Sequence, residues 1–142
     1  MPSKVNIAID AMSGENSPKK IIDGIEISLK TNQDNFFFLY GRKELLEKEI
    51  SKKKLVDQNC EIINTKDVIL DSESPLAAAK KGKESSLWKA VESQKEEKSD
   101  ISLSAGNTGA MLVISRLILN TIEGISKPAL AGLWPNNNNM SV

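Results

Sequence analysis

The segment best suited to binding a small anion is residues 103–112, which read LSAGNTGAML. A short strand-like run precedes it and apolar residues at helical spacing follow it, so it predicts a strand, a turn and a helix. Gly106 and Gly109 would let the turn take positive φ or approach a ligand closely. Asn107 or Thr108 would cap the helix, whose first N–H groups are free and carry partial positive charge. A turn of this kind predicts a phosphate site.

The same residues also fit an ordinary tight turn that binds nothing, but the position of the turn favours a binding site. Residues 10–17 and 104–109 both follow the carboxyl end of a predicted strand, and ligands of parallel α/β folds bind at such ends. Asp10 begins the first of these loops. Its carboxylate could order a hydroxyl, a lysine or backbone donors around a phosphate, or could simply cap N–H groups of the loop.

A third segment, residues 80–86, places three lysines beside two hydroxyl groups in the sequence KKGKESS. Lys83 is a candidate for the cation that balances a phosphate charge. Ser85 and Ser86 begin a predicted helix, whose N-terminus could face the same anion. The bare sequence favours the simpler alternative, which is a solvated linker between two helices.

The chain contains no histidine, which excludes a Ser-His-Asp or Cys-His nucleophile and a histidine-ligated metal site within these residues. The groups that remain suit a reaction whose nucleophile is already an anion, such as phosphate. Nineteen basic residues balance nineteen acidic ones, so no basic field indicates a nucleic-acid partner. The chain has neither GxGxxG nor GxxxxGK, so nucleotide binding has no motif support. We expect no cofactor, no metal and no nucleic acid.

The composition also predicts the compartment. The single cysteine, Cys60, cannot form an internal disulfide and lies in an apolar run, which predicts a buried, inert thiol in a reducing environment. The apolar run at residues 5–9 is too short for a signal peptide. Residues 110–119 form the longest apolar stretch and fall well short of the roughly 20 residues that a membrane span needs. We expect a soluble, cytoplasmic protein.

Hydrophobic periodicity predicts strands that alternate with helices along the whole chain. The expected strands are residues 5–9, 35–40, 60–64, 100–104 and 129–134, and the expected helices are residues 18–32, 43–53, 76–81, 86–98 and 107–121. Ser17 is expected to cap the first helix, with Pro18 at its first position. In the second helix Leu45, Leu46 and Ile50 are expected to face the core. The alternation predicts one α/β domain with a mainly parallel sheet.

The last residues predict an incomplete element. Residues 136–139 are four asparagines, which predict a polar turn, and residues 140–142 resemble the beginning of another strand. A parallel sheet that ended there would have an unfinished edge. We therefore expect the chain to be a fragment, the N-terminal part of a larger domain.

Four blocks of sequence stand in the order and spacing of one protein family. They are IDAMSGEN at residues 9–16, SPLAAAKKGKESSL at 74–87, SAGNTGAML at 104–112 and KPALA at 127–131. Together the blocks extend along the chain, and the SAGNTGA block is highly specific to this family. The sequence resembles the phosphate acyltransferases of bacterial phospholipid synthesis, the PlsX family, whose members are much longer than this chain.

The resemblance implies a reaction of acyl-(acyl carrier protein) with inorganic phosphate that gives acyl phosphate and free carrier protein. It also implies a three-layer α/β/α sandwich similar to phosphotransacetylase, commonly as a homodimer, with possible peripheral membrane contact at full length. Two alternatives stay open. One is a phosphotransacetylase-like acyltransferase that uses acyl-CoA, and the other is a non-catalytic module that binds a phosphate-bearing ligand or the carrier protein.

The resemblance also implies roles for individual residues. The catalytic candidates are Asp10, Lys83, Asn107 and Thr108. The candidates for binding phosphate or substrate are Ser13, Gly14, Ser85, Ser86, Ser104, Gly106 and Gly109. Backbone N–H groups around residues 106–109 would hold the phosphate, with Asp10 as an orienting carboxylate.

The sequence departs from the family pattern at four positions. Ser13 stands where the family usually has glycine, and Glu15 where it usually has aspartate. Lys80 and Lys81 stand in places more often held by arginine. Arginine can bind phosphate through two parallel hydrogen bonds, and lysine cannot.

Overall fold

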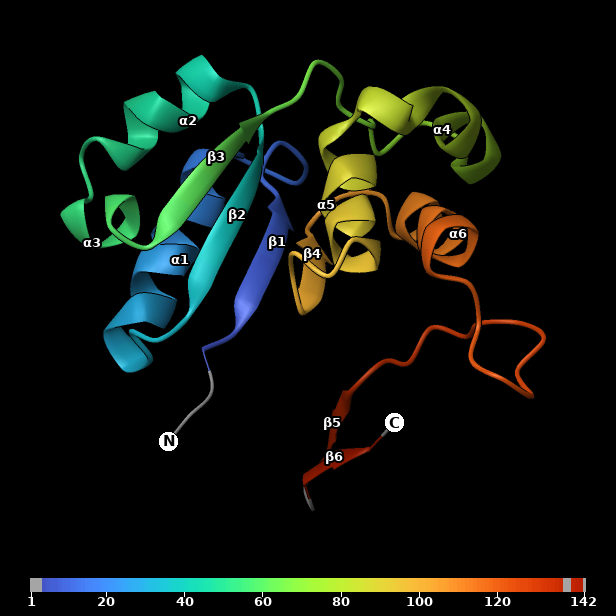
Figure 1. Ribbon diagram of the computed structural model, residues 1–142. Coiled ribbons are helices and arrows are strands. Elements are labelled where there is room, and N and C mark those ends of the chain that lie inside the picture. The colour runs from blue at the N-terminus through green and yellow to red at the C-terminus, as the bar shows by residue number, and fades with distance from the viewer. Residues whose placement is uncertain (1–3, 137–138, 142) are drawn as a thin grey trace.

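The computed structural model describes residues 4–136 and 139–141 as alternating strands and helices, followed by a small hairpin (Figure 1). The strands are β1 (Asn6–Asp10), β2 (Phe36–Gly41), β3 (Cys60–Asn64), β4 (Ile101–Ser104), β5 (Trp134–Asn136) and β6 (Asn139–Ser141). The helices are α1 (Lys19–Thr31), α2 (Lys43–Ile50), α3 (Lys54–Asp57), α4 (Pro75–Lys81), the 3-10 turn η1 (Gly82–Glu84), α5 (Ser86–Lys95) and α6 (Thr108–Leu119).

The first four strands form one sheet in the order β3-β2-β1-β4, and every pairing in it is parallel. Helices α1, α2 and α3 cover one face, and α5 covers the other with α4 and α6 packed beside it (Figure 1). Parallel strands need crossover connections, which place helices on both faces of a sheet. The predicted α/β class, with a helix layer on either side of a parallel sheet, is confirmed.

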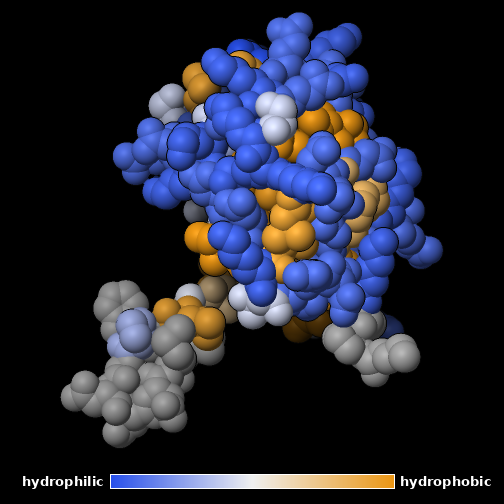
Figure 2. All heavy atoms as spheres, turned by 90° about the vertical axis from the view of Figure 1, so that its left-hand side faces the viewer, coloured by the Kyte–Doolittle hydropathy of each residue, from blue (hydrophilic) through white to orange (hydrophobic). Residues whose placement is uncertain are grey.

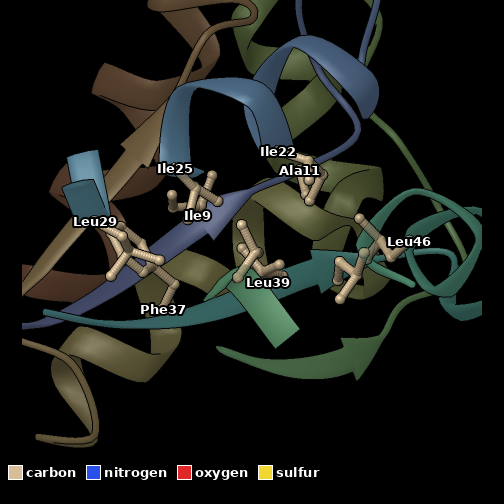
Figure 3. Close-up of a cluster of buried hydrophobic side chains, with 10 residues drawn as sticks. Ile9, Ala11, Ile22, Ile25, Leu29, Phe37, Leu39 and Leu46 are labelled. Carbon is tan, nitrogen blue, oxygen red and sulfur yellow. The ribbon is translucent and has the colours of Figure 1, made fainter. Parts of the chain in front are cut away.

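The core on the α1 face follows from the period-2 pattern of the strands and the 3.6-residue pattern of the helix. Ile9 and Leu39 point from β1 and β2 toward Ile22, Ile25 and Leu29 of α1, and all five are buried (Figure 3). On the opposite face, alternate strand residues pack against α5. Ala8 and Tyr40 contact Ala90 there. The strands are therefore held from both sides, which fixes where their carboxyl ends lie.

The expected start of the first helix is wrong. Helix α1 begins at Lys19, and Pro18 occupies the N-cap position, where it makes no side-chain cap. Ser17 instead donates its hydroxyl hydrogen bond to the carbonyl of Ser13, inside the preceding loop. The serine bonds within the loop because this segment does not become helical until after the proline.

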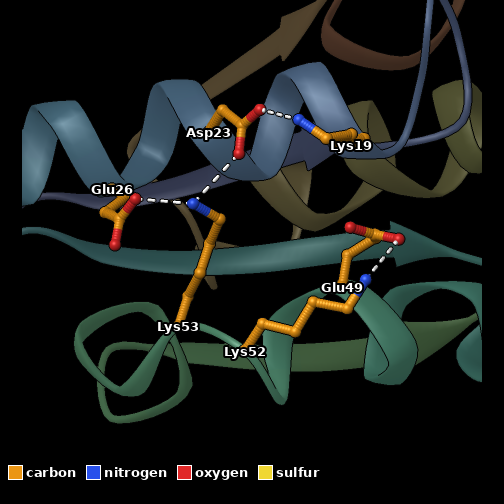
Figure 4. Close-up of polar contacts among 6 residues, drawn as sticks. All are labelled: Lys19, Asp23, Glu26, Glu49, Lys52 and Lys53. Atoms are coloured by element: carbon orange, nitrogen blue, oxygen red, sulfur yellow. Dashed lines mark hydrogen bonds and ion pairs between the residues drawn. The ribbon is translucent and has the colours of Figure 1, made fainter.

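The expected second helix, residues 43–53, ends early at Ile50, and a separate short helix that was not expected, α3, follows from Lys54. Leu46 and Ile50 are buried as predicted, but Leu45 is exposed because it lies on the outer side of α2. Between the two helices, Lys53 turns back toward α1. Its ammonium group pairs with Asp23 Oδ1 at 3.0 Å and with Glu26, which ties the α2–α3 connection to α1 (Figure 4).

The end of the chain differs most from the expectation. Helix α6 ends at Leu119, two residues earlier than predicted, and residues 129–133 are not a strand. Strand β5 begins only at Trp134 and pairs antiparallel with β6, with Asn136 opposite Asn139. The strand expected from Met140 therefore lies in a hairpin rather than in the parallel sheet. Residues 137–138 of the predicted turn, and Val142, lie outside the described residues.

The surface around α2, α3 and the β3 edge is mainly hydrophilic, with hydrophobic residues showing in places (Figure 2). None of the described helices is both long and apolar enough to cross a membrane. Among the described residues there is also no group of three or more acidic or cysteine side chains placed to hold a metal ion.

Candidate anion-binding site

The site begins where β1 and β4 end side by side. Asp10 and Ser104 are register partners at the carboxyl ends of these strands. The Ser104 hydroxyl donates a hydrogen bond of 2.9 Å to Asp10 Oδ2, and the Met12 N–H donates to Asp10 Oδ1 at 3.3 Å. Asp10 is fully buried, and none of the ion pairs among the described residues includes it. Hydrogen bonds alone hold this carboxyl group.

The Ser104 hydroxyl extends this contact to the turn. While it donates to Asp10, its oxygen accepts a hydrogen bond of 3.2 Å from the N–H of Gly106. A hydroxyl can donate once and accept twice, so this arrangement uses it in both directions. The buried carboxylate thus fixes the orientation of the turn that begins α6.

The loops after β1 and β4 pack directly against each other. A Cβ on Gly106 would lie 2.5 Å from Ser13 Cβ, so no larger residue fits there without displacement. Gly14 has a φ of +92°, and a Cβ on it would lie 2.9 Å from Ala105 Cβ. Positive φ was also expected at Gly106 or Gly109. Neither residue has it, and these glycines instead allow close approach of other protein atoms.

The N-cap of α6, which the sequence left open between two residues, is Asn107. Its Oδ1 accepts a hydrogen bond of 2.9 Å from the Ala110 N–H. The Asn107 Nδ2 group lies 2.9 Å from the carbonyl oxygen of Glu73, 3.3 Å from that of Leu70 and 3.4 Å from that of Asp71. One side chain therefore caps the helix and holds the loop before α4 against it.

Two N–H groups in the first turn of α6 have no hydrogen-bond partner among the described residues. Asn107 accepts the N–H groups of Ala110 and Met111. In the described part of the chain, the N–H groups of Thr108 and Gly109 make no hydrogen bond. Thr108 is also exposed as the first helical residue. Free N–H groups at a helix N-terminus favour an anion.

A buried hydroxyl faces the same place. Ser13 is 5% exposed and its Oγ has no hydrogen-bond partner among the described residues. The Oγ would lie 3.1 Å from a Cβ on Gly106, so it is directly beside the turn. A buried hydroxyl without a partner costs about 1–3 kcal/mol.

The segment at residues 80–86 makes no described contact with the two loops after β1 and β4. Ser85 Oγ accepts from the Trp88 N–H at 3.2 Å and so caps α5, and both Ser85 and Ser86 are fully buried. Lys83 is exposed in η1. Within the described ranges, no hydrogen bond or ion pair joins these three residues to Asp10, Ser104 or the turn that follows it.

Asp71 borders the site and was not expected there from the sequence. Its Oδ1 lies 3.5 Å from the position that a Cβ on Gly106 would take, so an acidic group borders the turn. The only local signal is the turn-forming sequence DSES at residues 71–74, which predicts a loop before a helix. Nothing in that composition indicates that the loop returns to residue 107, since this contact spans 36 residues.

The parallel sheet with helices on both faces defines an α/β protein, and the buried carboxylate, the helix N-terminus and the close pair of loops at its carboxyl edge make this edge the candidate anion site. Comparison with known proteins is more specific. The family described as "Fatty acid synthesis protein" matches residues 5–142, and the chain belongs to this family, the PlsX phosphate acyltransferases.

Three relatives indicate how much of the family the chain represents. It is 54% identical over 142 residues to the phosphate acyltransferase of Pelagibacter ubique (strain HTCC1062). This alignment covers all of the chain and 42% of the relative. It is 38% identical over 143 residues to that of Rhodopseudomonas palustris (strain TIE-1), covering all of the chain and 40% of the relative. It is 35% identical over 132 residues to that of Jannaschia sp. (strain CCS1), covering 93% of the chain and 36% of the relative. The chain thus spans about two fifths of the length of these relatives.

Proposed function

We propose that the chain is the N-terminal, phosphate-binding part of an acyltransferase that converts acyl-(acyl carrier protein) and inorganic phosphate to acyl phosphate. The proposal is supported by its family membership and by the relatives, each described as a phosphate acyltransferase. We further propose that the full-length protein is a cytoplasmic homodimer with peripheral membrane contact.

The observation that carries the proposal is the chain of hydrogen bonds from Asp10 through Ser104 to Gly106. It holds the turn in one orientation and leaves the N–H groups of Thr108 and Gly109 without a described partner. Donors that are fixed before the ligand arrives need no reorganisation when charge develops on it. Phosphate would sit at this N-terminus, with the exposed hydroxyl group of Thr108 as a further donor.

In this mechanism an oxygen of the bound phosphate attacks the carbonyl carbon of the acyl thioester. A C–O bond forms, the carbonyl oxygen gains negative charge, and collapse of this tetrahedral intermediate breaks the C–S bond. The carrier thiolate leaves and takes a proton from solvent. Because phosphate is already an anion, no histidine is needed to generate the nucleophile. Rate enhancement then comes from positioning and from stabilisation of the developing charge.

The individual side chains have distinct roles in this proposal. Asp10 orients the turn through Ser104 without touching the substrate. Asn107 sets the first turn of α6. Lys83 stays a candidate for the cation that balances the phosphate, although no described contact joins it to the turn. Asp71 lies at the edge of the turn. Its carboxyl group can accept a hydrogen bond from the hydroxyl of hydrogen phosphate.

The test is acyl phosphate formation by the protein at its full encoded length, with labelled inorganic phosphate and either acyl-(acyl carrier protein) or acyl-CoA. The Pelagibacter ubique relative serves as the positive control. We expect turnover with the carrier-bound thioester. Turnover with acyl-CoA alone would favour the phosphotransacetylase-like alternative, and phosphate binding without turnover would favour a binding module.

A pair of variants locates the site within the same assay. Thr108→Val removes a hydroxyl at the first position of α6 and should raise the KM for phosphate. Thr121→Val makes the same change at an exposed position after α6 and should leave the KM unchanged. Equal behaviour of the two variants would contradict the assignment of Thr108.

A further inference from the structure

The loop that leads into α4 lies alongside the first turn of α6. Asn107 Nδ2 lies 3.4 Å from the carbonyl oxygen of Asp71. A Cβ on Gly106 would lie 3.5 Å from Asp71 Oδ1, and a Cβ on Gly109 would lie 2.6 Å from Pro75 Cγ. The loop therefore follows the turn along its length and forms one side of the candidate phosphate site.

Two acidic side chains lie in this part of the loop, and they differ in what they bind. The Glu73 carboxylate accepts a hydrogen bond of 2.8 Å from the N–H of Leu70, so it is turned back on its own loop. The Asp71 carboxylate is exposed and makes no hydrogen bond or ion pair with the described residues. Asp71 therefore presents an unpaired carboxylate at the edge of the turn.

Hydrogen-bond donors and this acceptor meet at the turn. The N–H groups of Thr108 and Gly109 have no partner in the described part of the chain. Ser13 Oγ is buried, also lacks a partner among the described residues, and lies 3.1 Å from the position of a Cβ on Gly106. An ionised carboxylate can only accept hydrogen bonds. An anion held by the N–H groups of this turn would therefore meet an acceptor on the side of Asp71.

We propose that Asp71 selects hydrogen phosphate over fully ionised oxyanions, such as sulfate, at the Gly106 turn. The proposal rests on the proposed function and adds the residue that decides which anion is accepted. Hydrogen phosphate and sulfate are tetrahedral dianions of similar size, so the N–H groups of the helix bind them alike. Hydrogen phosphate can donate its proton in a hydrogen bond to Asp71, whereas sulfate would place an oxygen against the carboxylate with no proton between them. A hydrogen bond to a charged group is worth about ten- to hundredfold in affinity.

Competition between the two anions measures this selectivity directly. The experiment uses the protein at its full encoded length at pH 8, where most inorganic phosphate is the dianion. It follows the displacement of labelled phosphate by sulfate at constant ionic strength. We expect sulfate to bind the unsubstituted protein at least about tenfold more weakly than phosphate. Asp71→Asn supplies an amide that can donate to sulfate, so the two dissociation constants should then agree to within about threefold.

Two further variants control for charge and for folding. Asp67→Asn removes the same charge from the same loop, at an exposed residue with no described contact to the turn. It should leave the ratio of the two dissociation constants unchanged. Asp71→Ala removes the acceptor without adding a donor and should lower the ratio as Asp71→Asn does. The Asp71 side chain makes no described hydrogen bond or ion pair, so neither substitution there should lower the melting temperature.

Two larger oxyanions separate the effect of the proton from the effect of size. Arsenate carries a proton at this pH, and selenate does not. We expect arsenate to displace phosphate from the unsubstituted protein and selenate to fail, and we expect Asp71→Asn to bind selenate as well. Exclusion of both ions from the unsubstituted protein would mean that the site selects by size, which would overturn the proposal.

The binding ratio also separates this proposal from the proposed function. If acyl phosphate is formed and Asp71→Asn leaves the ratio unchanged, the assignment of Asp71 fails and the proposed function stands. If the ratio depends on Asp71 but no acyl phosphate is formed, the proposed function fails and the selectivity stands. If Asp67→Asn changes the ratio as much as Asp71→Asn does, the charge of the loop decides the selectivity and the proposal is overturned.

Discussion

Asp10 and Ser104 are 94 residues apart in sequence, yet the Ser104 hydroxyl donates to Asp10 Oδ2 at 2.9 Å across neighbouring parallel strands. Asp10 is fully buried and Ser104 half-buried, so the contact is largely shielded from water. The same hydroxyl accepts the N–H of Gly106. The orientation of the candidate phosphate turn therefore depends on a pairing between the first and fourth strands of the sheet.

The first prediction concerns that contact. Ser104→Ala should destabilise the protein by about 1–3 kcal/mol, because Asp10 loses its hydroxyl donor while staying buried. It should also raise the KM for phosphate, because the Gly106 N–H is released. Ser102→Ala is the matched control, since the Ser102 hydroxyl has its acceptors on α5, Gln94 Oε1 at 2.8 Å and the Ala90 carbonyl at 3.2 Å. It should lose stability alone, and a raised phosphate KM in both variants would contradict the role of Ser104.

The second prediction concerns the close approach of the two loops. Gly106→Ala places a Cβ 2.5 Å from Ser13 Cβ, so the turn must shift. A shift of this size in a positioning loop should lower kcat/KM for phosphate on the order of 100-fold. The double variant Ser13→Gly/Gly106→Ala removes the colliding atom and should recover part of this loss. Normal phosphate saturation by Gly106→Ala would refute the assignment of the turn.

The third prediction separates the two functions of Asn107. Asn107→Ser keeps an oxygen that can cap α6, whereas Asn107→Ala removes the cap and should cost about 1 kcal/mol more. Both variants lose the Nδ2 donor to the carbonyls of residues 70–73. Hydrogen exchange in residues 70–73 should therefore accelerate in both. Protection that survives in Asn107→Ser would show that other contacts hold this loop.

The fourth prediction is a pH dependence of the ion pairs around Lys53 (Figure 4). Hydrogen bonds from Lys19 and then Lys53 hold the pKa of Asp23 below 3.8, and Lys53 holds the pKa of Glu26 below 4.5. Glu26, followed by Asp23, raises the pKa of Lys53 above 10.5. Lowered carboxyl pKa values stabilise the fold above the unfolded-state pKa values and lose this effect as pH falls through the folded-state ones. The raised lysine pKa stabilises below the unfolded value and loses its effect as pH rises through the folded one.

Lys53→Met should accordingly lower the free energy of unfolding most between about pH 5 and pH 10, and less at either extreme. Urea unfolding across this range measures the difference. Lys52→Met removes an ion pair with Glu49 whose lysine is largely exposed, and it should have a smaller effect. A loss from Lys53→Met that does not vary with pH would indicate packing of its aliphatic chain rather than charge.

The fifth prediction is that Cys60 is structural. Burial, and then the charge of Asp57, raise the pKa of the Cys60 thiol to about 11, so the group is protonated at neutral pH. We expect slow alkylation by iodoacetamide at pH 8 in the folded protein and fast alkylation after unfolding. Cys60→Ala should cost on the order of 1 kcal/mol of stability and leave turnover intact. Loss of activity in a folded Cys60→Ala protein would reveal a role for the thiol.

The sequence by itself determined the elements and the chemistry of the turn. Parallel β strands that are covered on both faces need apolar runs, and helices need apolar residues at 3.6-residue spacing. Strands β1 to β4 and helices α1, α2, α4, α5 and α6 could therefore be located from local pattern, whereas the four-residue helix α3 could not. The pair of loops at residues 10–17 and 104–109 could be predicted for the same reason. Both follow strands, and parallel strands bring their carboxyl ends to one edge.

Other features could not be predicted because they depend on partners distant in sequence. Residues 129–133 have strand composition but pair with no strand in the described part of the chain, and β6 pairs with β5 rather than with the parallel sheet. Leu45 has the same composition as its buried neighbour Leu46, but only the packing of α2 on the sheet decides which of them is covered.

In the site, the sequence supplied the residue types and the fold selected their contacts. Asn107 and Thr108 were both candidates for the cap. In the structure Asn107 is the cap, and the carbonyl oxygens of the loop at residues 70–73 accept hydrogen bonds from its amide group. Gly106 reads as a conformational glycine, yet the tertiary structure requires it because Ser13 lies against it. Local composition specifies what a residue can do, whereas a contact across 94 residues exists only once the parallel sheet has brought β1 and β4 together.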